Sequence, residues 1–150
     1  MARRLPSEDR GQATVAQLAA RGDEVRAKYG PRLGWDELQH LLADRALVRY
    51  PCEVRFDAEP LLPGEAAHAV AKGAQPEEGF SIYVHPRYAS QLAVVPYLVL
   101  YQLILVNYGG RLSPEQAEAF GSHALGLSQE QYFAALCELA GQIGGGDPSP

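Results

Sequence analysis

The side chains best suited to chemistry in this chain are its histidines and cysteines, and their spacing forms no local metal or nucleophile motif. No two histidines have the four-residue spacing that places two imidazoles on one helix face. No GxSxG elbow, Gly-rich phosphate loop or CxxC pair occurs. We therefore expect no metal and no cofactor. The four histidines are His40, His68, His85 and His123.

A site assembled from distant residues remains an alternative. His68, His85 and His123, together with nearby acids, could hold a metal or act directly, and the protein would then be a hydrolase. Cys52 falls on a predicted strand and Cys137 on the apolar side of a predicted helix. We expect both to pack as small hydrophobic side chains.

Charge is distributed unevenly along the chain. Residues 1–50 carry nine Lys/Arg against seven Asp/Glu, and residues 51–150 carry four against eleven, for a net charge of -5. A dedicated nucleic-acid binder is usually more basic, so we expect no nucleic-acid partner. Arg45, Arg49 and Arg55 form a short basic run that could contact a phosphate or an acidic partner, although such arginines more often form weak surface ion pairs.

Periodicity and capping signals place the elements that must position any site. Apolar residues at helical spacing predict helices over residues 12–29 and 34–47. Alternation predicts a strand from Cys52 to Asp57, and β-branched and aromatic residues predict another over residues 80–85, with a weaker candidate over 66–71. Capping boxes at Ser113 and Ser128 open two helices that end near Leu125 and Ile143.

The helix after Pro96 is unusual because it is apolar on every side. From Tyr97 to Val106 only Gln102 is polar, so this helix must be central in the fold. A buried Gln102 amide needs partners, and a bond to the backbone is the simplest solution; a small binding pocket is the alternative. The apolar stretch over residues 92–106 is shorter than the ~20 residues that span a bilayer. We expect no membrane contact and a cytoplasmic protein.

Grouped strands and grouped helices predict an α+β fold, with a small mostly antiparallel sheet packed against helices and a central buried helix. We expect one domain over residues 12–143. Residues 1–11 are polar and predicted to be flexible, and the Gly- and Pro-rich residues 144–150 are predicted to be disordered.

This order of elements resembles the zincin-like metallopeptidase fold, in particular the minimal zincins of the ImmA/IrrE type. The resemblance covers about residues 35–125, with residues 82–86 as the edge strand. In that family the buried helix carries HExxH, and the next helix carries a glutamate that is the third zinc ligand. Here the corresponding residues are Tyr101, Gln102 and Leu105, and then Gln116. All four chemical positions differ, so the resemblance implies a pseudoenzyme without zinc.

The resemblance also implies where a ligand would bind. The former active-site groove would be lined by Tyr101, Gln102, Leu105 and Gln116. We therefore predict a non-catalytic domain that binds a protein partner or a small ligand there. Five tyrosines, which are large and half polar, are expected to cluster around the groove and favour binding. They are Tyr83, Tyr88, Tyr97, Tyr101 and Tyr108. A purely structural or oligomerising role is a further alternative.

Overall fold

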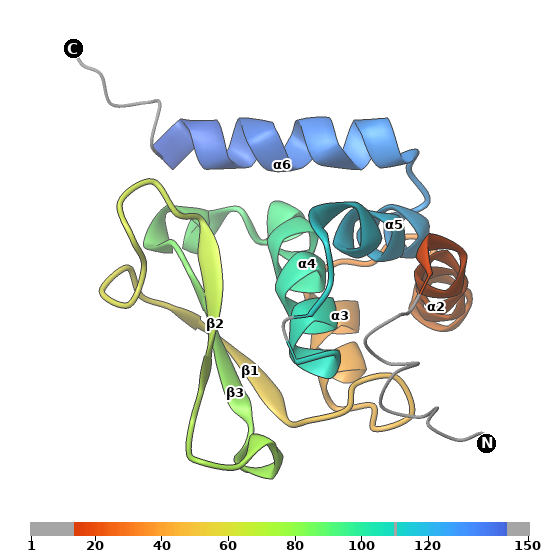
Figure 1. The fold of residues 1–150 in the computed structure, drawn as a ribbon. Coiled ribbons are helices and arrows are strands. Elements are labelled where there is room, and N and C mark those ends of the chain that lie inside the picture. Colours follow the sequence, from red (N-terminus) through yellow and green to blue (C-terminus); the bar gives the residue numbers. More distant parts are fainter. Residues whose placement is uncertain (1–13, 110, 144–150) are drawn as a thin grey trace.

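A computed structural model describes residues 14–109 and 111–143 of the chain. Figure 1 shows a small sheet on one side and helices on the other. The order is α2 (Val15–Tyr29), α3 (Trp35–Leu42), β1 (Cys52–Phe56), β2 (Ala67–Ala71), β3 (Phe80–Val84), α4 (Val95–Asn107), α5 (Pro114–Leu125) and α6 (Gln129–Ile143), with short 3-10 turns η1 (Pro76–Glu78), η2 (Pro86–Ser90) and η3 (Leu92–Val94). The predicted α+β class is confirmed. The predicted flexible segments 1–11 and 144–150 lie outside the described residues.

The sheet is mixed, with the strand order β1-β3-β2. β2 and β3 pair antiparallel, whereas β1 pairs parallel with β3. The prediction of a mostly antiparallel sheet with residues 82–86 at its edge was therefore wrong. The chain turns back at η1, so that β3 runs beside β2. The other edge of β3 pairs with β1, and β3 is therefore the central strand. β1 and β2 are the edge strands, and β2 lies against α4.

α4 is the central helix, as its apolar sequence predicts. Val95, Val99 and Leu100 are fully buried, and Pro96 occupies its first turn, where a missing N–H is tolerated. The helix lies between the sheet and the other helices (Figure 1). It begins after η3 and ends at Asn107. One side of α4 contacts β2 and β3, and this side carries Gln102.

α2 and α5 pack closely because small residues meet at their crossing. Gly22 of α2 is buried, and a Cβ built on it would lie 2.4 Å from the carbonyl oxygen of Phe120. On α5, Ala117 and Ala124 are fully buried. Close backbone approach thus fixes α5 against α2, and α5 in turn supports one wall of the site described below.

α6 lies across the other helices (Figure 1), and two tyrosine hydroxyls link it to the rest of the fold. Tyr132 of α6 is fully buried, and its hydroxyl donates to the carbonyl oxygen of Tyr97 on α4 at 2.6 Å. Burial raises the pKa of the Tyr132 hydroxyl well above its ordinary value, so it remains a donor. Tyr88 donates from η2 to the carbonyl oxygen of Leu139. These contacts hold α6 over the end of the sheet.

The predicted end of the second helix was wrong, and two predicted capping boxes were confirmed. The helix predicted over residues 34–47 ends at Leu42, where Ala43 caps it and turns follow. Both predicted capping boxes are present: Ser113 accepts from the N–H of Gln116, and Ser128 accepts from the N–H of Gln131. The local start signals are therefore accurate, while the turn after α3 depends on tertiary contacts.

Candidate functional site

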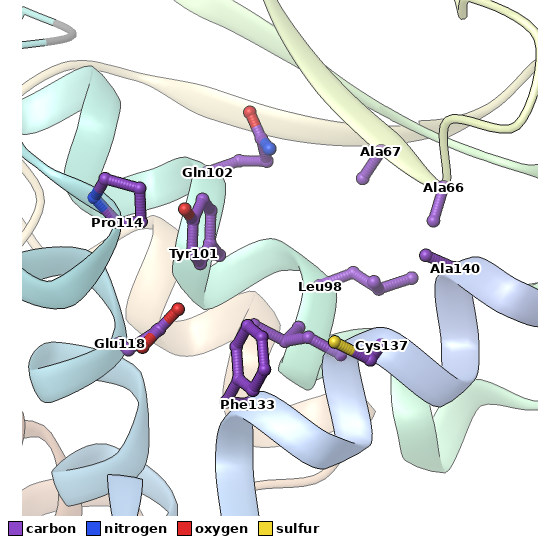
Figure 2. Close-up of a pocket in the computed structure, with 11 residues that line it drawn as sticks. Ala66, Ala67, Leu98, Tyr101, Gln102, Pro114, Glu118, Phe133, Cys137 and Ala140 are labelled. Carbon is purple, nitrogen blue, oxygen red and sulfur yellow. The ribbon is translucent and has the colours of Figure 1, made fainter. Parts of the chain in front are cut away.

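A groove with mostly apolar walls lies between the start of β2 and helices α4, α5 and α6. Its volume is about 310 Å³. Figure 2 shows Ala66 and Ala67 on one side of it, and Phe133 and Cys137 of α6 on another. The lining residues are Ala66, Ala67, Leu98, Tyr101, Gln102, Pro114, Glu118, Phe133, Leu136, Cys137 and Ala140.

Gln102 connects α4 to the edge strand of the sheet. Its Oε1 accepts a hydrogen bond from the backbone N–H of Ala69 on β2 at 3.2 Å. This confirms the interpretation that the single polar side chain of α4 bonds to backbone. An edge-strand N–H is satisfied in this way, and the wall of the groove is held in place. The amide is thus both a structural link and a polar group of the groove.

Tyr101 and Glu118 provide the remaining polarity at one end of the groove. Tyr101 projects from α4 and Glu118 from α5, and both side chains are half-buried. Burial, and after it the Glu118 carboxylate, raise the pKa of the Tyr101 hydroxyl. Gln129 Nε2 lies 3.5 Å from Glu118 Oε1, which is a long hydrogen bond. This end of the groove therefore presents a protonated phenol and a carboxylate.

α6 supplies a wall that the sequence did not suggest. Phe133 is 52% exposed although it is large and apolar, and it lines the groove. The expectation that Cys137 is packed away was wrong, because its side chain is exposed on the same wall. Cys52 is half-buried, and burial raises the pKa of its thiol to about 11. The apolar side of α6 is thus only partly covered by protein.

The structure places the four predicted site residues in two groups. Tyr101 and Gln102 line the groove. Leu105 is half-buried and packs against the core. Gln116 belongs to the capping box of α5, where its Oε1 accepts from the N–H of Ser113 at 2.7 Å. Glu118, two residues further along α5, is the residue of that segment that reaches the groove.

The tyrosines and histidines do not gather around this groove. Of the five tyrosines expected there, Tyr101 lies in the lining. Among the histidines, His68 lies 3.6 Å from Glu65, His85 accepts from the N–H of Arg87, and His123 lies 2.9 Å from Asp23. Within residues 14–109 and 111–143, no three His, Cys, Asp or Glu side chains are grouped so that they could hold one metal ion.

The four residues to which the resemblance pointed do not offer donor atoms that suit zinc. Tyr101 keeps its proton because its pKa is raised, and Gln102 Oε1 already accepts from Ala69. Leu105 has no donor atom, and Gln116 is an amide. Zinc prefers deprotonated thiolate or carboxylate and neutral imidazole, so this set does not fit the ion. No step of metal-assisted hydrolysis can be derived from these four residues.

Comparison with known proteins adds no relative. No protein-family model, no curated protein and no solved structure matches this chain at a significant level. A search of the described helices for one long and apolar enough to cross a membrane also found none. The groove's own geometry is therefore the basis for a functional proposal.

Proposed function

We propose that this chain is a non-catalytic, zincin-like domain that binds a small, mostly apolar ligand in the groove between β2, α4, α5 and α6. The observation that supports this best is the groove itself, with a volume of about 310 Å³ and largely hydrocarbon walls. Small-molecule sites are typically concave and apolar, with a few polar groups that fix orientation. Here the polar groups are Tyr101, Gln102 and Glu118.

The polar end limits the kind of ligand. A half-buried carboxylate favours a donor or a positive charge, and the Tyr101 hydroxyl adds one donor and one acceptor. The ring of Phe133 from α6 and the side chain of Leu98 from α4 offer apolar surface in the same groove to an apolar body. A compact aromatic or aliphatic amine combines both features.

Displacement of a dye tests the binding site directly. N-phenyl-1-naphthylamine is uncharged and fluoresces more strongly in apolar surroundings, so we expect saturable binding to the wild-type protein. In Ala140→Trp the indole enters the groove, and dye affinity should fall about tenfold or more. Ala134→Trp is the matched control, because Ala134 is an exposed residue of α6 outside the lining. Equal dye binding in both variants would reject the groove as the site.

Metal content tests the non-catalytic part of the proposal. Protein purified without a histidine tag, incubated with zinc and desalted, should retain less than about a tenth of an equivalent of zinc by elemental mass spectrometry. Close to one equivalent would overturn the pseudoenzyme proposal. Substituting His68, His85 and His123 one at a time would then locate the ligands and make the hydrolase alternative the better one.

A further inference from the structure

A second recess lies at the C-terminal end of α4, away from the groove, and three arginines line it. Its volume is about 270 Å³. Arg21 comes from α2, whereas Arg45 and Arg49 come from the segment after α3. Guanidinium groups that are distant in sequence are therefore brought to one concave surface. The lining residues are Arg21, Arg45, Ala46, Leu47, Arg49, Asn107 and Tyr108.

Contacts with the backbone and with an aromatic ring position two of the arginines. Arg45 Nη1 lies 3.3 Å from the carbonyl oxygen of Leu42 and 3.4 Å from that of Val48. The guanidinium carbon of Arg49 lies 5.5 Å from the centre of the Tyr50 ring. These contacts reduce the conformational freedom that each side chain would lose on binding a ligand.

Asn107 fixes the floor of the recess. Its Oδ1 accepts from the backbone N–H of Arg49 at 2.9 Å, and its Nδ2 donates to the carbonyl oxygen of Leu47 at 3.0 Å. The side chain is buried, so these two bonds tie the arginine-bearing segment to the end of α4. Asn107 has a structural role here, and the groups open to a ligand are the arginines and Tyr108.

The charge in the recess is not balanced by the protein. Arg21 forms an ion pair with Glu24 at 2.9 Å. Within the described ranges, neither Arg45 nor Arg49 is paired with a carboxylate. Asp44, the neighbour of Arg45, is already bonded to Lys28 Nζ at 2.6 Å and to another side chain. Three guanidinium groups against one carboxylate leave an excess of positive charge in a protein whose net charge is -5.

We propose that this recess binds the phosphate or pyrophosphate group of a small molecule. Guanidinium groups match the oxygens of phosphate with two parallel N–H···O bonds, and a phosphate dianion would balance the excess charge. The volume leaves room for an attached group beside Tyr108. This site shares no residue with the apolar groove, so it does not depend on the proposed function.

Calorimetric titration with inorganic pyrophosphate at constant ionic strength tests the proposal. We expect saturable binding to the wild-type protein. Arg45→Gln and Arg49→Gln should each weaken it about tenfold, because each removes a charged hydrogen-bonding group. Arg55→Gln is the matched control: Arg55 is an exposed arginine of β1, paired with Glu53 and outside the recess. Circular dichroism spectra of all variants check that the fold is kept.

Two outcomes would overturn the proposal: no saturable heat for the wild type up to about 5 mM pyrophosphate, or equal affinity in Arg49→Gln and Arg55→Gln. The source of the phosphate is tested with phenyl phosphate and a phosphoserine hexapeptide. Binding of phenyl phosphate supports a free small molecule. Binding of the hexapeptide alone would overturn that part of the proposal and indicate a phosphorylated partner chain.

Discussion

At the scale of single residues, Gly22 controls how closely α2 and α5 approach. A Cβ at this position would meet the Phe120 carbonyl oxygen at 2.4 Å and the His123 Cβ at 2.8 Å. Because a backbone atom is the nearest neighbour, the helices would have to separate. Gly22→Ala should lower the free energy of unfolding by about 2 kcal/mol, despite the ~1 kcal/mol that alanine gains in a helix interior. Urea denaturation followed by circular dichroism measures this.

A matched control exists in α6. A Cβ at Gly141 would meet nothing within 4 Å, and the residue is exposed. Gly141→Ala should therefore raise the free energy of unfolding by up to about 1 kcal/mol. If both substitutions shift stability in the same direction, close packing at Gly22 is not the reason for its glycine.

The two cysteines should differ strongly in reactivity. Cys137 is exposed in the groove, whereas Cys52 is half-buried with a thiol pKa of about 11. At pH 8 such a thiol is only ~0.1% thiolate, and the thiolate is the reactive form. Ellman's reagent should modify one thiol per chain quickly and the second slowly. Cys137→Ser should remove the fast phase, and a groove ligand should slow it; a fast phase that survives this substitution would contradict the assignment.

Residue-level prediction from sequence succeeded where local chemistry decides. The bond from Gln102 to backbone follows from one amide in an apolar helix. The exposure of Cys137 does not, because apolar neighbours predict burial and only the position of α6 decides it. Glu118 was missed for a similar reason. The resemblance pointed to Gln116, whereas the orientation of α5 directs Glu118 to the groove.

At the scale of elements, α6 depends on Tyr132 for its attachment. The hydroxyl bonds to Tyr97, and the ring packs against Gly121, where a Cβ would lie 2.3 Å from a ring atom. Tyr132→Phe should cost about 1 kcal/mol, because a backbone carbonyl loses its donor. Tyr132→Ala should cost about 3–5 kcal/mol by leaving a cavity. Thermal and urea unfolding measure both losses.

Phe133 is the control for this prediction. It is adjacent on α6 but 52% exposed, so Phe133→Ala should change the free energy of unfolding by about 0.5 kcal/mol or less. It should nevertheless weaken dye binding, since the ring lines the groove. A loss of stability as large as that of Tyr132→Ala would mean that α6 packs differently.

Element boundaries were predictable where side chains bond to nearby backbone. The capping boxes at Ser113 and Ser128 lie where the sequence placed them, and Pro96 lies in the first turn of α4. Strand order was not predictable, because alternation indicates which residues form a strand but not which other strand it pairs with. The parallel pairing of β1 with β3 follows only from the three-dimensional path of the chain.

At the scale of the whole molecule, charge separates the two proposed sites. All groove residues come from residues 51–150, which carry four Lys/Arg against eleven Asp/Glu. All three arginines of the second recess come from residues 1–50, where basic residues are in excess. The net charge of -5 does not by itself show this uneven distribution of charge along the chain. The groove should thus attract cations and the recess anions, which makes the two sites selective in opposite senses.

The charge preference of the groove can be measured with two ligands of nearly the same shape. Phenethylamine is cationic at pH 7, and phenethyl alcohol is neutral. Because Glu118 is half-buried in the lining, the amine should displace the dye at a concentration about 3- to 10-fold lower in dilute buffer. Salt at about 0.5 M should reduce this ratio, and Glu118→Gln should bring it close to one. An alcohol that competes as well as the amine against the wild type would show that Glu118 does not select the ligand, and the groove would then be a purely apolar site.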